Sequence, residues 1–170
     1  NNPGSLGIAI SEAIEAVVKS EGKAKYALGS VLGHVLMHQT INGNEAILQM
    51  EQAGDYPDII VGCTGGGSNL AGLMFPFLGQ QLRGGQKIDI IGCEPLSCPS
   101  FTKGKYAYDH GDMARMTPLI KMHTLGSDFL PPANHSGGLR YHGMSYHLSH
   151  LYDLGLMRAK AYGQKDCFEA

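Results

Sequence analysis

Three consecutive glycines followed by a serine and an asparagine form the part of this sequence best suited to bind an anion. These residues are Gly65, Gly66, Gly67, Ser68 and Asn69. Glycine has no Cβ, so backbone N–H groups in such a stretch can approach a phosphate closely. The serine hydroxyl and the asparagine amide can add further donors. The stretch therefore predicts a phosphate-binding loop.

Two nucleotide-binding motifs match this loop only in part. A P-loop requires lysine before its Ser or Thr, and no lysine stands next to Ser68. The dinucleotide fingerprint G-x-G-x-x-G fits Gly65 and Gly67, but Leu70 occupies the place of the third glycine. Its acidic ribose partner is expected about 20 residues on, whereas Glu94 comes later, after the next apolar run. A single phosphate fits better than a nucleotide, and a glycine turn without any ligand stays open as the alternative.

Ser5 is a second hydroxyl at an expected helix start. It follows a Pro-Gly turn and precedes apolar residues at helical spacing, where an N-cap belongs. If this helix and the one after the glycines begin at the same edge, Ser5 can meet the same anion. Glu94 ends an apolar run, where it can either line the site or cap a turn.

The elements that must position these residues alternate between helices and strands. Helices are expected at 5–20, 34–54, 68–83 and 138–155, and strands at 24–31, 57–63, 87–95 and 156–163. The continuous apolar run 57–63 is typical of a strand buried on both faces of a parallel sheet. Residues 96–136 are expected to form a long loop region with little regular structure. This alternation predicts an α/β fold with a parallel sheet, which places the glycine loop at the carboxyl edge where ligands bind.

The composition excludes several functional classes. Hydrophobic residues make up 43% and charged residues 16%, with a net charge of −2, so nucleic acid is not an expected partner. No apolar stretch reaches the roughly 18 residues that a membrane helix needs, so no membrane association is expected. The four cysteines form no Cys-x-x-Cys pair, which favours a reduced, cytoplasmic location.

Several histidines lie close enough in sequence to be tested as metal ligands. His34 and His38 are spaced i, i+4, but they stand among Val, Leu and Met and are expected to be buried or at an interface. His147 and His150 share a helical face that does not include His142. No cysteine or carboxylate accompanies them, so helix surface or packing is expected rather than a zinc site.

The stretch "PDIIVGCTGGGSNLAGLMFPF" and the later "IGCEP" closely resemble the phosphate-loop region of the tryptophan synthase beta chain family. Members of this family are fold-type II enzymes that use pyridoxal 5′-phosphate. Other blocks match in order along nearly the whole chain: "SLGIAISEAIE", "YALGSVLGHVLMHQT", "TPLIKMHTLGSDFLPP" and "HSGGLRYHGMSYHLSHLYDLGL". The third and fourth of these resemble the divergent second type of beta chain.

The resemblance implies a three-layer α/β/α fold with a mostly parallel sheet, and it assigns residues 1–170 to part of the cofactor-binding large domain. The residues implied to hold the cofactor phosphate are Gly65, Gly66, Gly67, Ser68, Asn69 and Ser5. A monovalent cation, Na⁺ or K⁺, is implied at the backbone carbonyls of Gly65, Tyr141 and Gly143. The implied reaction is that of a lyase that condenses indole with L-serine to give L-tryptophan. The implied partners are a second copy in a homodimer and, less directly, an alpha subunit.

The chain also departs from the family pattern. No histidine is followed by lysine, so the His-Lys-x-Asn motif with the Schiff-base lysine is not among these residues. The chain begins without methionine and ends within an expected helical turn, so we interpret it as a fragment that is inactive alone. Arg140 stands where standard beta chains carry an aspartate that touches the substrate, which makes Arg140 a candidate for the substrate pocket. Serine or threonine dehydratase, threonine synthase and a non-catalytic phosphate-binding module remain the alternatives.

Overall fold

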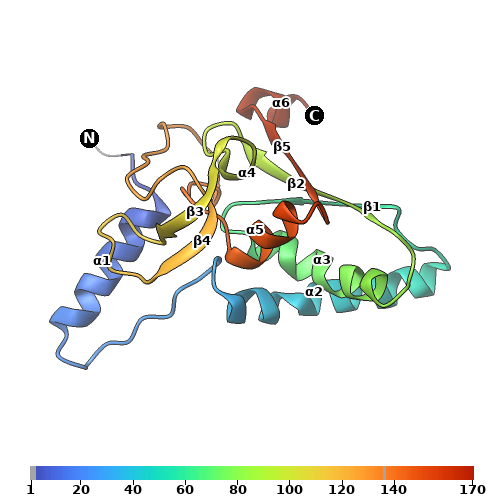
Figure 1. Ribbon diagram of the computed structural model, residues 1–170, viewed down its shortest axis with the longest axis horizontal. Helices are drawn as coiled ribbons and strands as arrows, with labels where there is room; N and C mark the ends of the chain where they lie inside the picture. Colours follow the sequence, from blue (N-terminus) through green and yellow to red (C-terminus); the bar gives the residue numbers. More distant parts are fainter. Residues whose placement is uncertain (1–2, 136) are drawn as a thin grey trace.

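The computed structural model describes residues 3–135 and 137–170 and has a mixed α/β architecture (Figure 1). Its helices are α1 (Leu6–Lys19), α2 (Gly33–Ala53), α3 (Ser68–Leu82), α4 (Ser100–Lys103), α5 (Tyr146–Asp153) and α6 (Gln164–Glu169). Its strands are β1 (Ile59–Cys63), β2 (Asp89–Pro95), β3 (Lys105–His110), β4 (Leu119–Thr124) and β5 (Arg158–Tyr162). Strands β1, β2 and β5 form a parallel sheet in that order, while β3 and β4 pair antiparallel. The predicted α/β class with a parallel sheet is confirmed.

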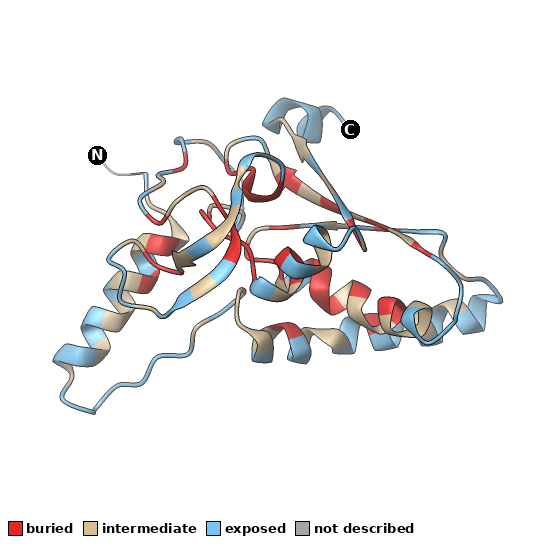
Figure 2. Ribbon diagram, viewed as in Figure 1, coloured by how far each residue is buried: buried red, intermediate tan, exposed pale blue. Residues whose placement is uncertain are grey.

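The core lies between the parallel sheet and α3, and α2 packs on α3 (Figure 1). Buried residues are concentrated along α3, whereas α2 is mostly exposed (Figure 2). The two helices approach closely at Gly43, where an added Cβ would lie 2.4 Å from the Leu73 carbonyl oxygen. Helix α2 ends as predicted at Gly54, which has a left-handed φ of 68° that glycine adopts without strain.

The second face of the sheet is not covered in the described part of the chain. Ile60 of β1 is buried, but Ile59 and Val61 on the opposite face are 54% and 56% exposed. The expectation that β1 is buried on both faces is therefore wrong for these residues. The reason is that α3 packs against one face only, and alternating side chains of a strand point to opposite faces.

Two further expectations about elements are wrong. The strand expected at 24–31 is not formed: residues 24–29 have no regular secondary structure and pair with no strand in the described chain, and residues 30 and 31 form a turn. A stretch of chain becomes a strand only when a partner strand lies beside it. Residues 138–145 are not helical, and α5 begins only at Tyr146, after the turn and bridge residues that end at Gly143.

The loop region expected at 96–136 is more regular than predicted over its described part, residues 96–135. It contains α4 and the hairpin of β3 and β4, in which Lys105 pairs with Thr124 and His110 with Leu119. The alternation of Tyr106 and Tyr108 was a signal for β3, but the run is short and Pro118 directly precedes β4. Prolines near a strand weaken its sequence signal, since proline is tolerated at the first residues of a strand but not in its centre.

Within residues 3–135 and 137–170, every helix is too short or too polar to cross a membrane. All four cysteines are free thiols: Cys63, Cys93, Cys98 and Cys167.

Candidate phosphate-binding site

The glycine loop connects the end of β1 to the start of α3, as predicted. Thr64, directly before the glycines, donates its backbone N–H to the Cys93 carbonyl of β2 at 2.8 Å, so the loop leaves the sheet at its carboxyl edge. An added Cβ on Gly66 would lie 2.4 Å from Ser30 Oγ, and one on Gly67 would lie 2.6 Å from Leu148 Cδ1. Gly67 also has a φ of 111°. Close packing at Gly66, and close packing together with the positive φ at Gly67, therefore favour glycine at these two positions.

The backbone N–H groups of this loop are unpaired. Those of residues 65–70 donate no hydrogen bond to any residue that the structure describes, and the first loop carbonyl to accept from α3 is that of Gly67, from Ala71 at 3.0 Å. Gly66 and Gly67 are buried, and a buried N–H group without a protein acceptor is unfavourable unless a ligand or an ordered water accepts its hydrogen bond. The partial positive charge of the α3 N-terminus adds to these donors. Such a set of unsatisfied donors is suited to an anion.

The two polar residues after the glycines differ in what they offer. Ser68 starts α3 and is half-buried, and its hydroxyl has no partner in the described chain. Asn69 donates through Nδ2 to the Cys63 carbonyl at 3.2 Å and to Cys63 Sγ at 3.3 Å. Asn69 therefore braces the loop against β1, while Ser68 keeps a free donor.

Ser145 supports the loop from the start of α5 and was missed by the sequence reasoning. Its N–H donates to the Gly66 carbonyl at 2.9 Å, and its side chain lies beside Gly67. Ser145 is 1% exposed, and its hydroxyl has no hydrogen-bond partner in the described structure. No motif marks this serine, because its role depends on how α5 packs.

Ser5 forms the predicted N-cap of α1. Its Oγ accepts the Ile8 N–H at 3.2 Å, and the Leu6 N–H donates to the Arg140 carbonyl at 3.0 Å. Residues just before Arg140 touch the glycine loop, since an added Cβ on Gly65 would lie 3.1 Å from both the Gly138 carbonyl and Leu139 Cδ2. The segment 138–140 thus contacts both predicted phosphate-binding segments.

Arg140 itself is half-buried, and its side chain contacts backbone. The guanidinium donates to the carbonyls of Pro131, Pro132 and Asn134 and, on the other side, to those of Pro3 and Gly4. It forms no ion pair within the described residues. Its predicted contact with substrate is not tested by this geometry and stays a prediction.

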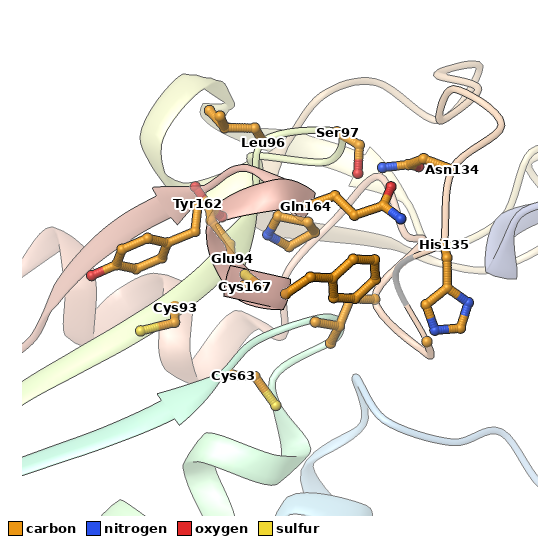
Figure 3. A pocket seen from close by; sticks show the side chains of 14 residues that line it. Cys63, Cys93, Glu94, Leu96, Ser97, Asn134, His135, Tyr162, Gln164 and Cys167 are labelled. Carbon is orange, nitrogen blue, oxygen red and sulfur yellow. The ribbon is translucent and has the colours of Figure 1, made fainter. Parts of the chain in front are cut away.

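A cavity of about 340 Å³ opens beside the loop (Figure 3). Its lining residues come from the ends of β1, β2 and β5, from the two residues after β2, from residues 134–135 and 137–139, and from α6: Cys63, Cys93, Glu94, Pro95, Leu96, Ser97, Asn134, His135, Gly137, Leu139, Tyr162, Gln164, Cys167 and Phe168. Gly65, Gly66 and Gly67 are not part of this lining. Cys63, two residues before Gly65, and Leu139, which lies beside Gly65, are part of it. The cavity is mostly apolar, as suits a flat ring next to an anion site.

Glu94 lines this cavity and also caps a helix. Its carboxylate accepts the N–H groups of Phe101 and Thr102 and the Thr102 hydroxyl, at 2.6–2.9 Å. These bonds use both oxygens at the start of α4, so the two roles left open from the sequence coexist, with capping occupying its hydrogen bonds.

The three carbonyls expected to bind a cation are unpaired. Those of Gly65, Tyr141 and Gly143 accept no hydrogen bond from any described residue. Tyr141 is buried, its hydroxyl donates to the Gly111 carbonyl at 2.6 Å, and burial raises its pKa. Free carbonyl oxygens suit a monovalent cation, and the cation site itself stays a prediction.

The histidines occupy separate environments. His34 and His38 are exposed in the single chain, so they are not buried within it, and an interface position stays a prediction. His38 Nδ1 donates to the His34 carbonyl at 2.7 Å. His142 is buried, which lowers its pKa, and its Nε2 donates to the His110 carbonyl. His147 lies against Phe75 as a packing residue.

Known proteins that are similar to this chain include tryptophan synthase beta chains. No protein-family model matches the chain. The tryptophan synthase beta chain 2 of Aeropyrum pernix is 55% identical over 170 residues, which is 100% of this chain and 38% of the relative. The corresponding chains of Aquifex aeolicus and Thermotoga maritima are 57% and 55% identical, over 99% and 100% of this chain and 39% and 40% of theirs.

A solved structure shares the fold. The crystal structure of a threonine deaminase from T.th. superposes with a TM-score of 0.56 at 17% identity, covering 79% of this chain and 41% of that one. The chain spans about two fifths of the length of the curated relatives it matches. The predicted resemblance to the tryptophan synthase beta chain family is therefore confirmed along the whole of this chain.

Proposed function

We propose that this chain supplies the phosphate-binding loop of a pyridoxal-5′-phosphate enzyme that condenses indole with L-serine to give L-tryptophan. The observation that carries the proposal is the row of unpaired N–H groups over residues 65–70, buried at Gly66 and Gly67. An unsatisfied buried donor is unfavourable, so a phosphate that accepts several of these bonds would stabilise the loop.

The residues present fit the cofactor. Backbone N–H donors are offered by Gly65, Gly66, Gly67 and Ser68, and the three glycines have no Cβ to block a phosphate. Ser68 adds its hydroxyl as a further donor. Ser5 can still donate its hydroxyl proton, because its Oγ acts only as acceptor towards Ile8. Pyridoxal 5′-phosphate would supply an electron-withdrawing ring that stabilises negative charge at the substrate α-carbon. This chain's own residues would fix the phosphate and hence the position of the ring.

The remaining features of the family are part of the same proposal. We assign residues 1–170 to the cofactor-binding domain, with indole and L-serine as substrates and a homodimer as the assembly. An alpha-subunit partner and a cytoplasmic location remain predictions. The carbonyls of Gly65, Tyr141 and Gly143 are the proposed ligands of a monovalent cation.

The alternative of a dehydratase-type enzyme is less well supported. Threonine deaminase shares the fold at 17% identity, which shows the fold alone. The beta chains of Aeropyrum pernix and Aquifex aeolicus are 55% and 57% identical over 99% or more of this chain. The difference favours tryptophan synthesis.

The cofactor part of the proposal is tested by ligand binding to this chain. Pyridoxamine 5′-phosphate needs no Schiff-base lysine, so its affinity measures the phosphate site directly. We expect calorimetry to show binding of pyridoxamine 5′-phosphate at least about tenfold tighter than pyridoxamine. Equal affinity for the two compounds would reject the phosphate site.

The reaction is tested by exchange of segments. The 170 residues replace the matched segment of the Thermotoga maritima beta chain 2, and tryptophan formation from indole and L-serine is measured. We expect activity that requires pyridoxal 5′-phosphate. A folded, cofactor-binding chimaera that instead deaminates threonine would favour the alternative.

A further inference from the structure

The Arg140 side chain connects two segments that are far apart in the sequence. One guanidinium nitrogen, Nη2, donates to the Gly4 carbonyl at 2.8 Å and to the Pro131 carbonyl at 3.2 Å. The other, Nη1, donates to the Pro132 carbonyl and, at 3.3 Å, to Asn134 Oδ1. A single side chain thus joins the residues before α1 to the loop 131–134.

Proline is frequent in the two segments that the Arg140 side chain joins. Pro3, Pro131 and Pro132 lack backbone N–H groups, so neither segment can form a regular hydrogen-bonded ladder with the other. A guanidinium presents five N–H donors in a fixed plane, and it can serve carbonyls on two sides at once. Lysine presents its three donors from one point and cannot bridge in the same way.

The Arg140 main chain lies between the two halves of the proposed phosphate site. Its carbonyl accepts the Leu6 N–H at 3.0 Å, one residue after Ser5. Two residues earlier, the Gly138 carbonyl lies against Gly65. Asn134, which accepts a hydrogen bond from the guanidinium, also lines the neighbouring cavity.

We propose that Arg140 is a positioning residue that fixes Ser5 and the loop 131–134 relative to the glycine loop. This inference rests on the proposed function, because it assigns Arg140 to the geometry of the same phosphate site. In this role Arg140 acts through the carbonyls that it holds, and the role requires no contact between Arg140 and the substrate. Its effect on affinity therefore depends on the ligand's phosphate.

The test compares the wild-type chain with Arg140→Gln and Arg140→Lys, using pyridoxamine 5′-phosphate and pyridoxamine as probes. Arg83→Gln, at an exposed position at the end of α3, is the control for loss of one positive charge. We expect Arg140→Gln to weaken binding of the phosphorylated probe by about tenfold and binding of pyridoxamine by less than about twofold. We expect Arg140→Lys to weaken binding as much as Arg140→Gln does. Lysine keeps the positive charge, but it loses the guanidinium that bridges the two segments, and Gln loses both.

Three outcomes would overturn the inference. Wild-type affinity in Arg140→Gln would show that the bridge does not matter. Restored affinity in Arg140→Lys would show that charge alone acts. Equal weakening of both probes would place Arg140 against the ring or the substrate.

Hydrogen exchange keeps the inference testable if the variants do not fold. In the wild-type chain, pyridoxamine 5′-phosphate should slow amide exchange in residues 4–8 and 137–141 together, and leave residues 44–52 of α2 unchanged. Protection of only one of the two segments would also overturn the bridge. A wild-type chain that binds neither probe would instead reject the proposed function, whereas normal binding by the variants rejects only the role of Arg140.

Discussion

Helices α1 and α3 begin on either side of the segment 138–140, and their N-termini are completed in opposite ways. At α1, the Ile8 N–H is capped by Ser5 Oγ, and the Leu6 N–H is bonded to the Arg140 carbonyl. At α3, the N-cap is Gly67, which has no side chain, and the N–H groups of residues 65–70 have no acceptor among the described residues.

The start of α1 is therefore stabilised by the protein itself, whereas the start of α3 keeps N–H groups that a ligand can use. Both starts were predicted to face one phosphate, but only α3 has several donors left for a ligand. At the start of α1, the N–H groups of Leu6, Ile8 and Ala9 already have protein acceptors, so Ser5 has a single hydroxyl proton to offer. In the proposed phosphate site, the glycine loop would therefore be the main anchor and the α1 end a secondary contact.

The largest effect is expected from Gly67→Ala. The substitution places a Cβ 2.6 Å from Leu148 Cδ1 on a backbone with a φ of 111°. We expect a loss of roughly 2–5 kcal/mol in the free energy of unfolding, measured with urea, because steric overlap adds to backbone strain. Gly29→Ala is the control, since an added Cβ there meets nothing within 4 Å. Unfolding of Gly67→Ala at the wild-type midpoint would show that the loop is not fixed as described.

A smaller effect is expected at Asp112, which secures α1 to the turn before β4. Its fully buried carboxylate accepts from Ser11 Oγ at 2.8 Å, the Met116 N–H at 3.1 Å and the Thr117 N–H at 2.9 Å. We expect Asp112→Asn to lose about 1–3 kcal/mol at neutral pH, because it removes an ionised acceptor.

The same residue predicts a pH dependence. Burial acts to raise the pKa of Asp112, but hydrogen bonds from Thr117, Met116 and Ser11 outweigh it and hold the pKa below 3.8. The carboxylate stabilises the fold above pH 3.8, and this contribution is lost as the pH falls through the lowered pKa. The stability gap between wild type and Asp112→Asn should therefore narrow in acid. The exposed Asp153→Asn serves as control, and a gap that widens in acid would contradict the prediction.

Ser5→Ala should mainly reduce stability. The loss of an N-cap typically lowers the free energy of unfolding by about 1 kcal/mol. Ser5→Asn, which keeps a capping acceptor, should restore most of it in the same urea titration. Unchanged stability together with lost binding of pyridoxamine 5′-phosphate in Ser5→Ala would contradict this prediction. It would mean that Ser5 acts on the ligand and not as the cap of α1.

Ser68→Ala should show the opposite pattern with the smallest change in stability. Ser68 has no hydrogen-bond partner in the described chain, so we expect less than about 0.5 kcal/mol in unfolding. Binding of pyridoxamine 5′-phosphate should weaken by about tenfold in calorimetry. Unchanged affinity would remove the hydroxyl from the site and leave only backbone donors.

The sequence predicted most elements because their signals are local. Apolar runs marked β1 and β2, and Ser5 and Gly54 marked the ends of α1 and α2. The missed hairpin and the wrongly assigned residues 24–29 share one cause. A strand depends on a partner elsewhere in the chain, and no local pattern says whether that partner is there.

For the site, the sequence by itself determined the glycines, the strand–loop–helix order and the resemblance to tryptophan synthase beta chains. These follow from residue types and spacing, which are read along the chain. Only the tertiary structure decided that the Leu6 N–H at the start of α1 bonds to the Arg140 carbonyl, that Ser145 supports the loop and that Arg140 bridges two segments. Those facts depend on contacts between residues up to 137 positions apart, and such contacts are fixed by packing in three dimensions.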